Sequence, residues 1–166
     1  MNSPIEVFSR NPKVCLDSQI NDFMALVLAG GEVGAEGLET RVRAAERLVF
    51  LTVGCCLSGV AAMKRPSASY RTRVASTSGM ELPEGKFPYE LGWVFVMPSV
   101  RGRRFSFDLT REALAGVSDG VFATSRSDNS AMHATLEKFE FLPAGAEWNS
   151  TRGDYRLKLF VRNALA

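Results

Sequence analysis

The chain has 166 residues, of which 46% are hydrophobic and 23% are charged. A chain of this length and composition can bury a sizeable core, so we expect one globular domain over residues 1–166 and exclude a disordered tail. The formal net charge of +2 is too small to indicate a nucleic-acid partner, because that kind of binding needs many clustered basic contacts.

Membrane and metal partners are not expected either. No apolar run approaches the ~20 residues that cross a bilayer, and the first ten residues lack the apolar stretch of a secretory signal. The three cysteines, Cys15, Cys55 and Cys56, match neither a disulfide framework nor the spacing of metal ligands. We therefore expect a cytoplasmic protein with reduced thiols and no metal site.

The first part of the chain predicts a strand and two helices. Residues 5–8 favour an edge strand. Asp17 or Ser18 can cap a helix that ends at Gly30, and its apolar residues recur at helical spacing at Ile20, Phe23, Met24, Val27 and Leu28. A second helix is expected from about residue 38 to residue 47.

Two strands and a polar insert come next. Residues 48–53 and 57–63 are nearly continuous in apolar and β-branched residues, and Gly54 permits a turn between them, which is typical of a β-hairpin. Residues 64–88 are rich in Ser, Thr, Arg and Gly, so we interpret them as a substrate-facing loop. Within this insert, residues 70–76 alternate in a way that could form a third strand.

The run from Tyr89 to Gly116 predicts a buried strand, a turn at Pro98, an arginine-rich loop and an amphipathic helix. A basic loop that leads into a helix directs free N–H groups and the positive end of the helix dipole to one place, which favours an anion such as a pyrophosphate. After this run, residues 120–124 predict a short strand, Asn129 begins a helix, and residues 145–150 and 155–161 predict two last strands.

Three stretches in this half of the chain carry a family resemblance: ELGWVFVMPSVRGRR with the helix after it, GVFATSRSDNSAMHATLEKFEFLPAG, and the last β-hairpin. In order and spacing, residues 89–162 resemble the GNAT superfamily of acetyl-CoA-dependent N-acetyltransferases; before residue 89 the likeness is only topological. The resemblance implies an α/β fold of the α+β kind. It has a mixed, mostly antiparallel central sheet of six to seven strands, with splayed parallel strands at the centre and about four flanking helices.

The resemblance also implies a site for acetyl-CoA. The acyl-CoA loop of the family, Arg/Gln-x-x-Gly-x-Gly/Ala, is matched by Arg101, Gly102, Arg103, Arg104, Phe105 and Ser106. In this chain Arg104 and Ser106 replace the usual small residues. The backbone of Val94, Phe95 and Val96 would bind the pantetheine arm, and the side chain of Asn129 would contact the cofactor. The tyrosine that many members use as general acid, seven residues after this asparagine, is replaced by Leu136.

Acetyl transfer to an amine requires a group that removes a proton from the ammonium. Glu90 is our candidate base, because it lies four residues before Val94, where several family members carry a glutamate; an exposed structural carboxylate is the alternative. The backbone N–H of Val94 or Val96 could polarise the acetyl carbonyl. The thiolate would be protonated by water, by Ser130 or by another residue. Tyr70 could line the acceptor site, although packing is its default role.

We therefore expect an N-acetyltransferase that transfers the acetyl group of acetyl-CoA to a primary amine of a small molecule or a protein, as a monomer or a homodimer. The polar insert contains only Glu81 and Glu84 against five basic residues, which favours a neutral or anionic acceptor. The alternative is a catalytically impaired CoA-binding or regulatory protein. The replacements at Arg104, Ser106 and Leu136 would support that alternative.

Overall fold

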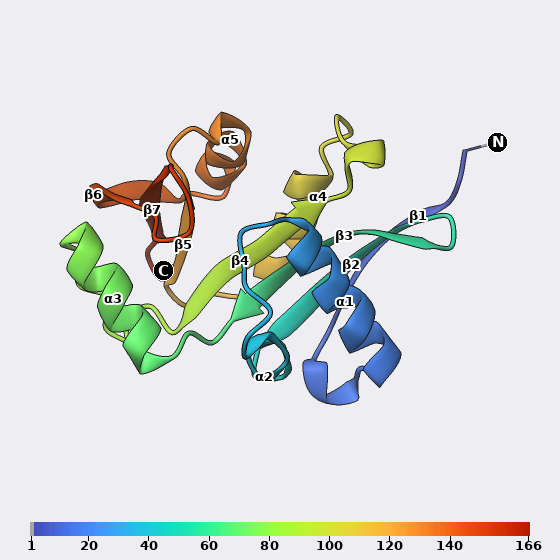
Figure 1. Ribbon diagram of the computed structural model, residues 1–166, viewed down its shortest axis with the longest axis horizontal. Coiled ribbons are helices and arrows are strands. Elements are labelled where there is room, and N and C mark those ends of the chain that lie inside the picture. The colour runs from blue at the N-terminus through green and yellow to red at the C-terminus, as the bar shows by residue number, and fades with distance from the viewer. Residues whose placement is uncertain (1) are drawn as a thin grey trace. The chain divides into compact units, whose positions relative to one another are not determined.

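The computed structural model of the protein describes residues 2–166 (Figure 1). Its helices and strands follow in the order β1 (Ile5–Arg10), η1 (Pro12–Val14), α1 (Asp17–Ala29), α2 (Leu38–Arg43), β2 (Arg47–Val53), β3 (Cys56–Lys64), α3 (Ala68–Ser78), β4 (Tyr89–Val96), η2 (Pro98–Val100), α4 (Phe105–Leu114), β5 (Val121–Arg126), α5 (Ser130–Lys138), β6 (Leu142–Asn149) and β7 (Arg156–Arg162). The labels η1 and η2 denote single turns of 3-10 helix.

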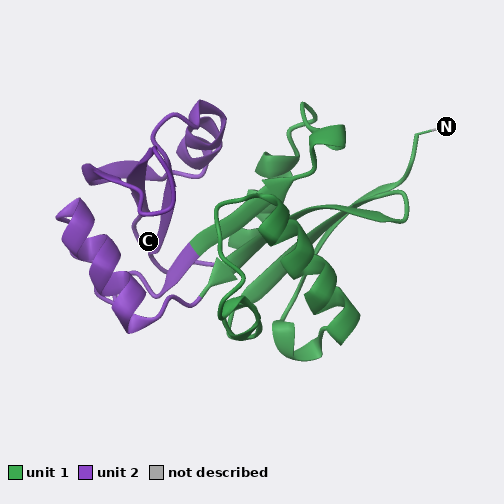
Figure 2. Ribbon diagram, in the orientation of Figure 1, with its two compact units in different colours: residues 1–64, 91–115 green, residues 65–90, 116–166 purple. Residues whose placement is uncertain are grey.

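These elements form two compact units (Figure 2). The first contains the chain up to Lys64 together with Leu91–Ala115. The second contains Arg65–Glu90 and Gly116–Ala166. Strand β4 contributes its first two residues to the second unit and the others to the first.

In the first unit, the antiparallel strands β1, β2 and β3 have helices on both faces. Phe50 and Val60 share a core with Ile20 and Phe23 of α1, and α2 contributes further apolar residues to it. The neighbouring positions point to the other face, because side chains alternate along a strand. There Gly59 approaches Leu109 of α4 so closely that an added Cβ would lie 3.2 Å from the Leu109 side chain.

In the second unit, β7 pairs with both β5 and β6 in antiparallel register. Tyr89 and Glu90 of β4 pair in parallel with Val121 and Phe122 of β5. Helix α3 packs on β6 and β7. The core that these elements share consists of Val74, Leu82, Phe87, Phe122, Leu159 and Val161.

Hydrogen bonding orders the strands as β1-β2-β3-β4-β5-β7-β6. Four of the neighbouring pairs are antiparallel and the central pair β4–β5 is parallel. The expected α/β architecture, with a mixed and mostly antiparallel sheet of six to seven strands, is therefore confirmed. The described residues form five α-helices, one more than the four that the sequence predicted.

The additional helix is α3, and it corrects the strand expected at residues 70–76. Ser67 caps the helix by accepting a hydrogen bond from the backbone N–H of Tyr70, and Gly79 ends it in the left-handed region at φ 70°. The buried residues Arg71, Val74 and Ser78 recur at the spacing of one helix face. The two-residue alternation of this segment was therefore misleading.

Helix α2 is shorter than the predicted helix, because it ends at Arg43. The chain then enters the sheet: the backbone N–H of Glu46 donates to the carbonyl of Met63 at 2.9 Å, and Arg47 begins β2. The Arg47 guanidinium donates to the carbonyls of Glu112, Ala113 and Ala115 at the end of α4. This contact supplies partners for carbonyls that a helix end leaves unbonded.

Within residues 2–166, no helix has both the length and the apolar character needed to cross a membrane.

The guanidinium of Arg71 is a structural centre of the second unit. Its residue is 9% exposed, and its N–H groups donate to the carbonyls of Leu82, Phe87 and Pro88. The guanidinium also lies 5.7 Å from the ring centroid of Phe122. Burial lowers the pKa of Arg71, while the negative charges of Glu84 and Glu90 oppose that shift. One side chain of α3 thus holds the segment that leads into β4.

Replacing Arg71 with methionine should destabilise the protein, because the apolar side chain leaves these buried carbonyls without a donor. We expect the free energy of unfolding to fall by about 2–4 kcal/mol, as measured by urea denaturation. The exposed Arg152 provides the control, and Arg152→Met should change stability by less than about 0.5 kcal/mol. An equal effect of both substitutions would contradict this role of Arg71.

Candidate functional site

Strand β4 carries the backbone predicted to bind a pantetheine arm. Its register with β5 consists, over the described chain, of the pairs formed by Tyr89 and Glu90. Residues 94–96 lie beyond that register, while Met97 donates its N–H to Ser58 of β3 at 2.8 Å. Between the two parts, Trp93 has φ 53°, an unfavourable backbone conformation for a residue with a large side chain. Strand β4 is thus hydrogen-bonded to β3 on one side, and its residues 94–96 lie outside the β5 pairing on the other.

The loop after β4 presents a row of backbone N–H groups. Phe107 and Asp108 are the first residues of α4 whose N–H groups bond a carbonyl, that of Arg104. For the N–H groups of residues 102–106, the described part of the chain provides no acceptor. Arg101, Gly102, Arg103 and Arg104 are exposed, Phe105 is buried and Ser106 is half-buried. The N–H groups and the start of a ten-residue helix favour an anion at this place.

Arg104 occupies a backbone conformation that normally favours glycine. Its φ of 62° and ψ of 23° place it in the left-handed region, immediately before α4. Its guanidinium lies 5.3 Å from the ring centroid of Phe107, so the side chain packs along its own helix. The residue that replaces the usual glycine therefore keeps the glycine-like backbone. Glu140, which follows α5, also has a positive φ, 66°.

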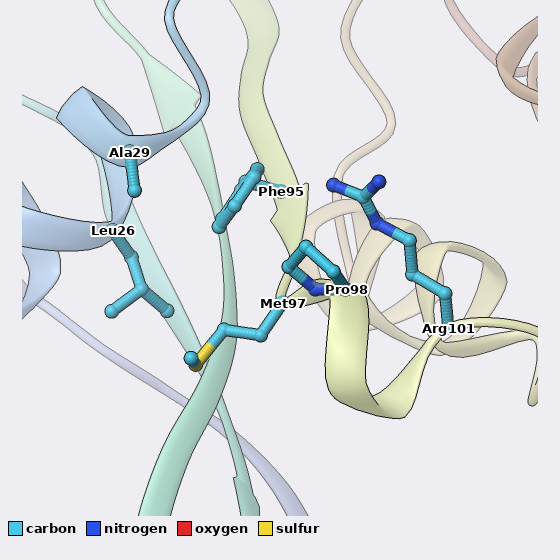
Figure 3. Close-up of a pocket in the computed structure, with 6 residues that line it drawn as sticks. All are labelled: Leu26, Ala29, Phe95, Met97, Pro98 and Arg101. Atoms are coloured by element: carbon cyan, nitrogen blue, oxygen red, sulfur yellow. The ribbon is translucent and has the colours of Figure 1, made fainter.

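Arg101 lies beside a pocket of about 290 Å³ in the first unit (Figure 3). Leu26 and Ala29 of α1 form one wall, and Phe95, Met97 and Pro98 form another. Arg101 extends back toward Phe95, and its Nε donates to the carbonyl of Val96 at 2.9 Å. This bond holds the guanidinium at the end of β4 and uses Nε as donor.

The second unit contains Glu90, the candidate base, and the structure shows that it is not the exposed carboxylate of the alternative reading. Its residue is 2% exposed, and Oε1 accepts a hydrogen bond of 2.8 Å from the Tyr70 hydroxyl. Burial raises the pKa of Tyr70 well above 10.0, and the negative charge of Glu90 is the second largest cause of this shift. Tyr70 therefore remains a neutral hydrogen-bond donor at physiological pH.

Asn129 and Leu136 lie on or next to α5, also in the second unit. The Asn129 side chain caps the helix by accepting a hydrogen bond of 3.1 Å from the N–H of Met132. Leu136 is fully buried, so the position of the usual tyrosine contributes to the core. His133 donates from Nε2 to the carbonyl of Arg126, and its ring packs against that of Phe160 with the two planes tilted by 47°, as in a structural histidine.

The contact that sequence reasoning missed is the one between Tyr70 and Glu90. It was hidden because residues 70–76 were interpreted as a possible strand. The signal that could have found the helix was present: a capping serine at position 67, a glycine at position 79, and Arg71, Val74 and Ser78 at helical spacing. Across residues 2–166, no group of three His, Cys, Asp or Glu side chains is arranged to hold a metal ion.

Comparison with solved structures identifies the fold. ElaA of Escherichia coli matches with a TM-score of 0.70 and 13% identity, over 96% of this chain and 99% of that one. A GNAT-family acetyltransferase of Bacillus cereus matches with a TM-score of 0.64 and 12% identity, over 98% and 99%. The yncA protein of Salmonella typhimurium, solved with its cofactor acetyl-CoA, matches with a TM-score of 0.60 and 13% identity, over 96% and 93%.

The chain therefore has the fold of the GNAT acetyltransferases, as its motifs indicated. No protein-family sequence model matches the chain, and no curated protein matches it at a significant level of similarity. The similarity between this chain and known proteins is therefore a similarity of three-dimensional structure.

Replacing Arg104 with glycine should stabilise the protein, because glycine adopts the left-handed conformation without a steric cost. We expect the free energy of unfolding to rise by about 0.5–1 kcal/mol in urea denaturation. The neighbouring Arg103 has no positive φ, so Arg103→Gly should instead lower it by a similar amount. Two changes of the same sign would contradict this explanation.

The raised pKa of Tyr70 makes stability depend on alkaline pH. The native state holds the phenol proton more tightly than the unfolded state, so this contribution is fully present below pH 10 and is lost as the pH rises through the native pKa. We expect the free energy of unfolding to fall more steeply above about pH 10 in the wild type than in Tyr70→Phe. Parallel curves for the two proteins would show that Tyr70 ionises normally.

Proposed function

We propose that the protein is an N-acetyltransferase, built as one GNAT-like domain, that transfers the acetyl group of acetyl-CoA to a primary amine. The observation that carries the proposal is the buried carboxylate of Glu90 at the last paired position of β4, on a strand whose following residues have backbone outside the β5 register. The fold supports it, since its solved neighbours include acetyltransferases and one that contains acetyl-CoA.

The residues after β4 fit the phosphate end of this cosubstrate. The N–H groups of residues 102–106 and the positive end of α4 offer hydrogen bonds and a favourable potential to a pyrophosphate. Arg101 and Arg103 add positive charge to the same exposed loop. Arg104 adopts the left-handed backbone conformation that a glycine would adopt here. The arginine side chain therefore does not force the loop into a different path.

When bound, the cosubstrate supplies a thioester that is open to attack by a neutral amine. In our proposal Glu90 accepts the proton of the ammonium, so that the nitrogen lone pair becomes available. The N–H of Val94 or Val96 donates to the carbonyl oxygen on which negative charge develops. The few acidic residues of the insert favour a neutral or anionic acceptor, which is a small molecule or a protein amine.

A second candidate is a CoA-binding regulatory protein without turnover. The observation that favours it is Leu136, since its buried aliphatic side chain cannot protonate a thiolate. Water or Ser130 would have to supply that proton in an active enzyme. The two candidates share the cosubstrate site and differ in turnover alone.

Binding and turnover test these candidates in turn. Isothermal titration with acetyl-CoA should show binding that weakens at higher salt, because the contacts are charged. Release of free thiol with a panel of amines should then identify an acceptor, and Glu90→Gln should lower kcat by about 10²–10⁴-fold. Glu6→Gln, at an exposed position of β1, is the matched control and should leave kcat unchanged.

Each result decides one part of the proposal. Absence of acetyl-CoA binding at millimolar concentration would reject both candidates. Binding without acetylation of any amine would favour the regulatory protein. An unchanged kcat in Glu90→Gln would remove Glu90 from the mechanism and leave the acetyltransferase activity standing.

A further inference from the structure

We propose that Tyr70 is a positioning residue for Glu90: its hydroxyl fixes one carboxylate oxygen and thereby holds the base in the orientation that accepts the proton of the acceptor amine. This inference rests on the proposed function and assigns a role to a helix outside the stretches that resemble the GNAT superfamily. It differs from the general acid that the family places on the helix after Asn129, because Tyr70 gives up no proton.

The first support is the burial of the carboxylate. Glu90 is 2% exposed, and a buried carboxylate is strongly destabilising unless hydrogen bonds replace its water shell. The Tyr70 hydroxyl donates to Oε1 at 2.8 Å, the usual length of an O–H···O hydrogen bond. Such a bond restricts the carboxylate to one orientation, which an unconstrained glutamate side chain would not keep.

The second support is that β5 fixes the backbone of Glu90. Glu90 pairs in parallel with Phe122, in the last registered pair of β4 and β5. Thr124, further along β5, also acts on the Tyr70 hydroxyl, and it lowers the pKa of the phenol as a hydrogen-bond donor does. The Glu90 side chain is therefore held through its backbone and through Oε1.

The third support is that α3 also fixes the backbone in front of Glu90. Arg71, the neighbour of Tyr70, donates to the carbonyls of Phe87 and Pro88, three and two residues before Glu90. One turn of α3 therefore positions both the Tyr70 hydroxyl and the strand that carries its acceptor, Glu90. The cation of Arg73 lies 5.3 Å from the Tyr70 ring centroid on the same helix.

The proton balance is simple. The ammonium of the acceptor loses one proton to the Glu90 carboxylate, which becomes a neutral carboxylic acid and returns that proton to solvent after turnover. The C–N bond then forms as the C–S bond of the thioester breaks, and the second proton that the nitrogen loses balances the one that the thiolate takes up through water or Ser130. Tyr70 keeps its own proton throughout, consistent with the high pKa of its phenol. Its contribution is therefore to kcat through geometry and not to the supply of protons.

The test uses the full chain, acetyl-CoA and the amine that the panel identifies. Tyr70→Phe keeps the ring and removes the hydroxyl, and we expect kcat to fall about 10- to 100-fold while KM for the amine and the affinity for acetyl-CoA change less than about twofold. In the Glu90→Gln background the same substitution should lower kcat by less than about twofold further, because the group that it positions is already lost. Tyr155→Phe is the matched control and should leave kcat unchanged.

A structural role would give a different pattern. If Tyr70→Phe lowers kcat equally in both backgrounds, or leaves it unchanged in the wild type, the inference is wrong. If Tyr70→Phe does not fold, Thr124→Val replaces a polar neighbour of the Tyr70 hydroxyl and should lower kcat about two- to tenfold, again only where Glu90 is present. Unchanged kcat in Glu90→Gln overturns the base and this inference together, and a panel in which no amine is acetylated overturns the enzyme itself.

Discussion

Much of the second unit depends on the buried guanidinium of Arg71. The chain between α3 and β4 directs three carbonyls inward, where water cannot bond them, and a single arginine fork supplies their donors. A buried charge is costly, and the carbonyl dipoles and the Phe122 ring offset that cost. Lysine has no planar fork with which to reach several carbonyls, so this constraint requires arginine.

The first unit meets a similar demand at the end of α4. Arg47 begins β2 and donates to the carbonyls of Glu112, Ala113 and Ala115, which ties the C-terminal end of α4 to the sheet. Backbone strain occurs at two other positions of this unit, because Trp93 and Arg104 both have positive φ. Both residues flank the stretch of β4 and loop in which backbone groups face a ligand in our proposal, and packing around them must hold these conformations.

The second unit brings together a buried carboxyl group, that of Glu90, and a neutral phenol, that of Tyr70. Burial keeps the Tyr70 proton in place, and the negative charge of Glu90 adds to that effect. The phenol in turn provides a hydrogen bond that the carboxylate needs in a site with little water. The loss of either side chain therefore removes a hydrogen bond from the other in a buried environment.

The sequence by itself determined the class of fold, the order of most elements and the basic loop after β4, because apolar periodicity, capping residues and the spacing of arginine and glycine are local signals. It also indicated Glu90 and the unusual residue at position 104. For residues 70–76 it suggested a strand, although both two-residue alternation and helical spacing were present. The segment is a helix, because its buried residues Arg71, Val74 and Ser78 pack along one helix face. Only the tertiary structure could bring Tyr70 to Glu90, since that contact joins residues twenty positions apart through the burial of a whole helix face.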